Sequence, residues 1–67
     1  MPKKIRELKS MLLRAGFKMR AGKGSHSVWS HELLEESITI SGNDGDDAKP
    51  YQEKDVRQSI RKAEESS

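Results

Sequence analysis

The sequence predicts a small α+β fold in the element order α-β-β-β-α, with two helices covering one face of a three-stranded antiparallel sheet. Three observations lead to this prediction. An apolar stripe at helical spacing lies near the start, short stretches that alternate apolar and polar residues occupy the middle, and a second helical stripe lies near the end.

The composition limits what the chain can build. The 67 residues are 36% charged and only 31% hydrophobic, which suits a single domain over residues 1–67 with a polar tail at 64–67. Without cysteine the chain forms no disulfide and offers no thiolate to zinc. Because no apolar run is long enough for a signal peptide or a membrane span, we expect a cytoplasmic protein.

Two stretches have the periodicity of amphipathic helices. The first covers residues 3–15, and Gly16 is well suited to end it. Its apolar residues fall within an arc of roughly 120° and are Ile5, Leu8, Met11, Leu12 and Ala15. The second covers residues 52–64 and places Val56, Ile60 and Ala63 on one narrow face.

Three strands are predicted between the helices, at residues 17–20, 26–31 and 37–41. The segment HELLEES, residues 31–37, is too short for an independent helix and is interpreted as the connection of a hairpin. The segment GNDGDDAKP, residues 42–50, has the glycine, asparagine, aspartate and proline content of a loop.

The second strand has two possible orientations. Alternation groups Ser27, Trp29 and His31 on one face, and His26, Val28 and Ser30 on the other. Burying the large indole contributes more than burying Val28, so we expect Trp29 inside. Its expected neighbours are Phe17, Met19, Ile38 and Ile40. The alternative register exposes Trp29 as a platform on which a nucleobase stacks.

Charge is distributed unevenly along the chain. Residues 1–24 hold eight Lys or Arg against one acid, Glu7, whereas residues 25–53 hold seven acids against Lys49. A basic patch of this kind suits a phosphate-bearing partner, but it is equally compatible with solvated helix faces.

His26 is the residue whose position most suggests chemistry. It follows a glycine-containing turn, where Gly22 and Gly24 remove side-chain bulk and the backbone amides are able to hold an anion. Lys18, Arg20 and Lys23 supply positive charge nearby. A phosphodiester with an adjacent 2′-hydroxyl fits this set, because histidine exchanges protons near neutral pH. An ordinary surface histidine at a strand end is the alternative.

Other chemistries lack their motifs, and we expect no metal and no cofactor. The stretch NDGDD lacks the ligand ladder and closing glutamate of a calcium loop. Alternation separates His26 from His31, which argues against a zinc pair. The stretch GKG lacks the ending of a phosphate-binding P-loop.

The tripeptide Gly24-Ser25-His26 lies after a helix ending in AGF and before an aromatic strand, and in this setting it resembles the HicA toxin family of bacterial toxin–antitoxin pairs. The resemblance also includes LKSMLLRAGF, GKGSHSVWSH, the third strand and KDVRQSIRKA, and so covers nearly the whole chain. It implies a fold like the double-stranded-RNA-binding domain, metal-independent cleavage of mRNA, and inhibition by a HicB antitoxin.

The resemblance also implies roles for particular residues. His26 corresponds to the catalytic histidine of the family, and we expect RNA contacts from Lys18, Arg20, Gly22, Lys23, Gly24 and Ser25. The chain departs from many relatives at Ser27, where they carry a second histidine. It also departs after the third strand, where they carry a proline and a histidine and this chain has an acidic loop that is expected near the open face of the sheet.

Two functions are therefore compatible with the sequence. One is a ribonuclease toxin in which His26 acts as general acid or base. The other is a non-catalytic module of the same fold that binds RNA or protein through the open face of the sheet.

Overall fold

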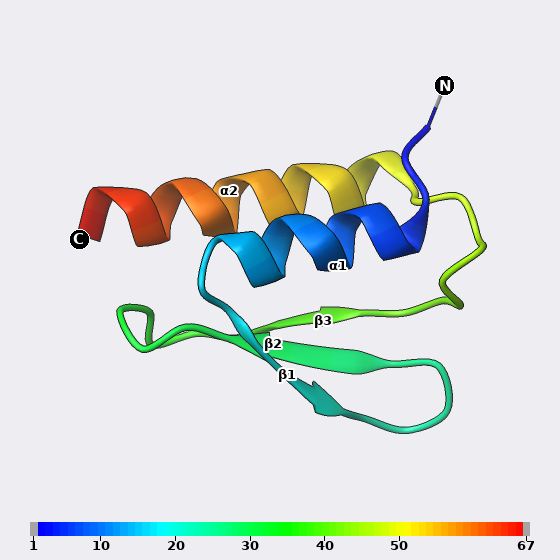
Figure 1. Cartoon of the computed structure of the whole chain (residues 1–67), viewed down its shortest axis with the longest axis horizontal. Coiled ribbons are helices and arrows are strands. Elements are labelled where there is room, and N and C mark those ends of the chain that lie inside the picture. Colours follow the sequence, from blue (N-terminus) through cyan, green and yellow to red (C-terminus); the bar gives the residue numbers. More distant parts are fainter. Residues whose placement is uncertain (1, 67) are drawn as a thin grey trace.

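The computed structural model describes residues 2–66 and has the predicted order of elements (Figure 1). Helix α1 (Ile5–Arg14) is followed by strands β1 (Lys18–Ala21), β2 (Ser27–Ser30) and β3 (Ile38–Ile40), and helix α2 (Pro50–Ser66) ends the chain. Both helices lie on the same side of the sheet, so the predicted two-layer α+β architecture is confirmed.

The sheet is antiparallel, with β2 in the centre and β1 and β3 at the edges. Met19 lies opposite Trp29 in the β1–β2 pair, and Trp29 lies opposite Ile38 in the β2–β3 pair. Residues that are directly opposite share a face, so this register determines which side chains point toward the helices.

The core forms between the helices and the sheet, and Trp29 is part of it. Its side chain is 1% exposed, which confirms the inward orientation and rules out the stacking platform. The largest fully buried side chains come from both helices and two strands and are Trp29, Ile5, Leu8, Leu12, Ile40 and Val56. Ile38, Met11 and Ile60 are partly buried against this cluster.

Met19 is the expected neighbour of Trp29 that stays largely outside the core, and it is 53% exposed. The register does turn it toward the side of Trp29. However, β1 is an edge strand, α1 packs against α2, and α2 packs over the other edge strand, β3. The helix layer therefore does not cover Met19.

The first helix ends as the glycine at position 16 predicts. Gly16 has φ of +92°, and the backbone N–H of Phe17 donates to the Leu12 carbonyl over 3.0 Å. The Gly16 N–H donates to the Leu13 carbonyl, which completes a Schellman motif. This tight end turns Phe17 into the core, where it is 3% exposed, and leads the chain directly into β1.

Candidate active site

The turn between β1 and β2 holds His26 in a defined backbone position. The His26 N–H donates to the Lys23 carbonyl over 2.9 Å, and the His26 carbonyl accepts from the Gly22 N–H over 2.9 Å. Gly24 has φ of +57° at the second position of this turn, a conformation in which glycine is favoured. His26 is exposed, so a short, hydrogen-bonded turn presents its imidazole to solvent.

Gly22 lies directly opposite His26, where there is little room for a side chain. A Cβ atom at position 22 would lie 3.3 Å from both the Cβ and the carbonyl oxygen of His26. That separation is tighter than ordinary contact, so a larger residue at position 22 would displace His26.

The face of the sheet that points away from the helices, called the open face below, carries two cations beside this turn. Register places Lys18 and Arg20 of β1 on it, opposite Ser30 and Val28 of β2. Gly22 and His26 lie opposite each other two pairs beyond Arg20 and Val28, so the alternation directs His26 to the open face as well. Lys18, Arg20 and the turn residue Lys23 are all exposed.

A groove of about 390 Å³ lies on the other side of the same turn and is called the His26 groove below. Its walls come from α1, β1, the turn and the loop that follows β3, which meet at one end of the molecule (Figure 1). Gly24, Ser25 and His26 line it, together with Lys9 of α1 and Asp44 of the loop. His26 therefore lies at the rim where the groove meets the open face.

Comparison with known proteins identifies the family. A family model described as HicA toxin of bacterial toxin-antitoxin matches residues 5–64, which is nearly the whole chain. The chain belongs to the HicA toxin family. No curated protein and no solved structure matches the chain significantly.

The tripeptide Gly24-Ser25-His26 lies within the matched residues and at the tip of the β1–β2 hairpin. The structure brings all the expected site residues to this hairpin but divides them between two surfaces. Gly24, Ser25 and His26 line the groove, whereas Lys18 and Arg20 lie on the open face.

Ser27 occupies the place where many HicA relatives have a second histidine, and it is an internal residue here. It is 4% exposed, accepts a 2.9 Å hydrogen bond from Trp29 Nε1 and donates to the Ile40 carbonyl over 3.4 Å. The departure at position 27 therefore changes the interior of this HicA family member and removes nothing from the exposed surface around His26.

The acidic loop does not lie near the open face, contrary to expectation. Its backbone folds back on the start of α1, where the Asp46 carbonyl accepts from the Ile5 N–H over 2.9 Å and the Asp44 carbonyl accepts from the Arg6 N–H over 3.2 Å. These carbonyls satisfy helix N–H groups that have no partner within the helix, and this capping explains the position of the loop.

The carboxylates of this loop are also engaged. Asp44 Oδ1 accepts from Lys9 Nζ over 2.7 Å, and Asp47 pairs with Lys4. Asp46 Oδ2 accepts a hydrogen bond from the backbone N–H of Asn43 over 2.9 Å. Lys4, just before α1, and Lys9 of α1 thus offset much of the negative charge that the sequence places after β3.

The other histidine, His31, makes contacts within the fold. The ring of His31 lies edge-on to that of Phe17, with the centroids 5.0 Å apart, and its Nδ1 accepts from the Leu33 N–H over 3.1 Å. His31 is half-buried at the β2–β3 connection, at the opposite end of β2 from His26. Of the two histidines, His26 is therefore the one whose side chain is exposed and makes no packing contact of this kind with the described residues.

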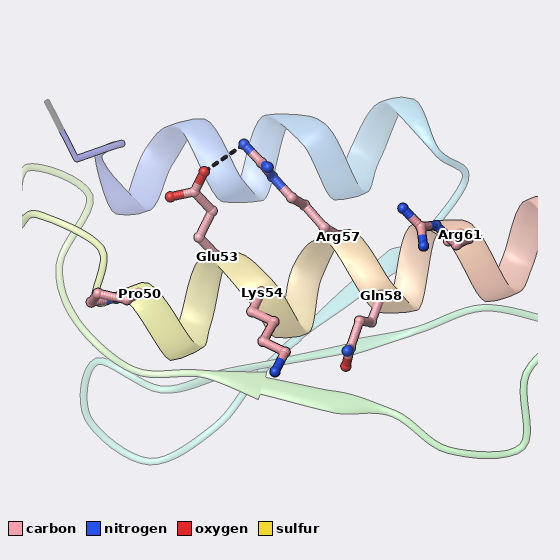
Figure 2. Close-up of a pocket in the computed structure, with 6 residues that line it drawn as sticks. All are labelled: Pro50, Glu53, Lys54, Arg57, Gln58 and Arg61. Carbon is pink, nitrogen blue, oxygen red and sulfur yellow. Dashed lines mark hydrogen bonds and ion pairs between the residues drawn. The ribbon is translucent and has the colours of Figure 1, made fainter.

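A second hollow, of about 380 Å³, runs along the outer surface of α2 (Figure 2). Its side chains come from that one helix, and Arg57 donates to Glu53 across one helical turn over 2.6 Å. It contains no histidine and lies apart from the hairpin, so we do not assign the active site there.

Residues 2–66 lack two further features. No group of three or more His, Cys, Asp or Glu side chains is arranged to hold a metal ion in this part of the chain. Neither described helix has the length and apolar character that crossing a bilayer requires.

The sequence did not indicate Lys9 as a site residue. It lies on the first helix, far from the tripeptide along the chain, and no motif marks it. Its place in the His26 groove results from the packing of α1 beside the hairpin and the loop, which no local pattern encodes.

Proposed function

We propose that this HicA family member is a toxin that cleaves mRNA without a metal ion, with His26 as its general acid–base residue. The observation that best supports the proposal is the position of His26. It is exposed, held by two backbone hydrogen bonds, and followed along the open face by the cations Arg20 and Lys18. Histidine exchanges protons near neutral pH, and the cations favour phosphate nearby.

The reaction that fits these groups begins at the 2′-hydroxyl of the ribose. The neutral imidazole of His26 accepts the hydroxyl proton, and the 2′-oxygen forms a bond to the adjacent phosphorus. The bond between phosphorus and the 5′-oxygen then breaks, and this oxygen takes a proton from the imidazolium or from water. The products are a 2′,3′-cyclic phosphate and a 5′-hydroxyl, and no redox change or added co-reactant is needed.

The surrounding residues stabilise charge during this reaction. Lys18, Arg20 and Lys23 offset the charge of the phosphates and of the phosphorane, which carries more negative charge than the substrate. The glycine backbones at positions 22 and 24 let the RNA approach closely, and the turn amides around Ser25 provide donors for a phosphate oxygen.

The family is the toxin half of bacterial toxin–antitoxin pairs, so an antitoxin partner follows from membership. We propose that this partner is of the HicB type, that both proteins act in the cytoplasm, and that the antitoxin covers Arg20 and Lys23 and hides His26. Exposed cations at the hairpin provide an attachment point for a surface with acidic residues.

The alternative is a non-catalytic module that binds RNA or protein through the same hairpin. One observation favours it, since His26 is the only histidine that lines the groove among the described residues. A single proton-exchanging side chain has to serve both as base and as acid, or share one role with water.

Inducible expression in bacteria separates these functions. We expect the wild-type chain to arrest growth, co-expression of the neighbouring antitoxin gene to relieve the arrest, and His26→Ala to remove toxicity at an equal protein level. His31→Ala is the matched control, because its contacts with Phe17 and Leu33 predict lower stability without loss of the chemistry. Arrest by the wild type and His26→Ala to the same extent would favour the binding module.

A further inference from the structure

The His26 groove contains one cation and one carboxylate among its described lining residues, Lys9 and Asp44. Lys9 belongs to α1 and Asp44 to the loop after β3, and both are brought to the groove by tertiary packing. Because His26 lines the same groove, an RNA bound with its cleaved bond at His26 would lie close to these charges.

The two residues form an ion pair that a phosphate is able to replace. Lys9 Nζ donates to Asp44 Oδ1 over 2.7 Å. The Lys9 side chain is 24% exposed and that of Asp44 is 65% exposed, so the lysine stem is held against the protein while the carboxylate faces solvent. Ion pairs at the protein surface contribute little to the free energy of folding. Replacing the carboxylate by a phosphate therefore costs little free energy.

The loop does not depend on this ion pair for its position. The Ile5 and Arg6 N–H groups donate to the carbonyls of Asp46 and Asp44. The Ala48 N–H also donates to the Lys3 carbonyl over 2.7 Å. Because the backbone already attaches the loop to α1, the Lys9 side chain is free to change partners without releasing the loop.

We propose that Lys9 is a phosphate-binding residue of the RNA site and that Asp44 competes with RNA for it. The proposal rests on RNA being the ligand, as in the proposed function, and adds a positive and a negative determinant of affinity. RNA binding transfers the Lys9 ammonium from Asp44 to a phosphate oxygen. The Asp44 carboxylate therefore weakens binding in two ways, by occupying Lys9 and by repelling the phosphate.

The chain contains a matched control pair. Lys4 and Asp47 form a second ion pair between the segment before α1 and the same loop, and neither residue lines the His26 groove. Lys4→Gln and Lys9→Gln change the net charge equally, as do Asp47→Asn and Asp44→Asn. A difference in RNA affinity between the two lysine variants, or between the two aspartate variants, therefore reflects the position of the charge and not the total charge.

The experiment measures binding of a fluorescein-labelled single-stranded RNA by fluorescence anisotropy, in the His26→Ala background so that cleavage does not interfere. We expect Lys9→Gln to raise Kd about three- to tenfold and to reduce the salt slope by ~0.7, the value for one phosphate contact on a single strand. Asp44→Asn is expected to lower Kd by about three- to tenfold, and the control variants to change it by less than about twofold.

The opposite signs distinguish a binding role from a structural one. If the pair only held the loop, Lys9→Gln and Asp44→Asn would both weaken binding, and this result would overturn the proposal. Shifts no larger than those of the control variants would overturn it while leaving RNA binding intact. If the shifts are opposite but the wild-type protein cleaves no RNA, the result would support the roles of Lys9 and Asp44 in binding and contradict the proposed nuclease. An absence of RNA binding by every variant would overturn both.

Discussion

The indole Nε1 of Trp29 donates a 2.9 Å hydrogen bond to the hydroxyl oxygen of Ser27, two residues earlier on the same strand. Both side chains are buried beneath the helices. A buried indole N–H requires an acceptor, and the hydroxyl at position 27 supplies it from the same face of β2. Ser27, the residue next to the candidate catalytic His26, is thus part of the buried core.

Ser27→Ala is therefore expected to destabilise the fold. The substitution leaves the indole N–H buried without an acceptor, which costs about 1–3 kcal/mol in the free energy of unfolding. Ser30→Ala, on the same strand but exposed, is expected to change it by less than about 0.5 kcal/mol. Urea titration followed by Trp29 fluorescence measures both, and equal midpoints for the two variants would contradict the assignment.

Two neighbouring leucines of α1 provide a test of the helix orientation. Leu12 is fully buried, and Leu13 is 59% exposed. Leu12→Ala is expected to cost about 2–5 kcal/mol, a large part of the stability of so small a fold, because it opens a cavity beneath α1. Leu13→Ala is expected to change stability by less than about 0.5 kcal/mol. Thermal unfolding by circular dichroism compares them, and a larger loss for Leu13→Ala would show the helix to be rotated.

Gly22 is expected to control the position of His26. Gly22→Ala introduces a Cβ 3.3 Å from the His26 carbonyl oxygen and Cβ, so His26 has to move. We expect cleavage of RNA to fall about tenfold or more, because small displacements of a catalytic group cost rate steeply. Gly45→Ala is the control, since a Cβ there meets no atom within 4 Å. Equal rates for the two variants would show that the spacing at Gly22 is unimportant.

The antitoxin complex is expected to depend on the cations of the hairpin. Arg20→Gln combined with Lys23→Gln should weaken the complex. The affinity of the wild type for the antitoxin should decrease as the salt concentration is raised from about 0.05 to 0.3 M. Arg57→Gln combined with Lys62→Gln on α2 removes the same charge elsewhere and should have little effect. Isothermal titration calorimetry measures both, and a larger loss for the α2 variant would place the antitoxin on the helix instead.

Local sequence patterns predicted the order of the elements and the direction of Trp29. Helical spacing from Ile5 to Leu12 and the alternation around Trp29 each depend on burial of one face, and burial dominates in a chain with so few large apolar residues. The exposure of Met19 was not predicted. Alternation gives its face correctly but does not reveal that the helices leave the edge strand uncovered.

The groove could not be predicted from local patterns. Lys9 and Asp44 meet because the loop after β3 caps the start of α1, and this depends on backbone hydrogen bonds between distant segments. The sequence places the aspartates after β3 but does not reveal that Lys4 pairs with Asp47 and Lys9 with Asp44. His26 could be singled out because a turn is local, and its glycines are visible in the sequence.

We propose above that His26 is the acid–base residue of a ribonuclease. The most direct test compares the rates at which purified wild type and His26→Ala cleave one RNA substrate in the presence of EDTA. Loss of a general acid–base residue typically costs about 10²–10⁴-fold in rate. We expect a decrease of that size for His26→Ala, an unchanged circular dichroism spectrum because His26 is exposed, and undiminished wild-type cleavage in EDTA. Equal cleavage by the two proteins would contradict the account.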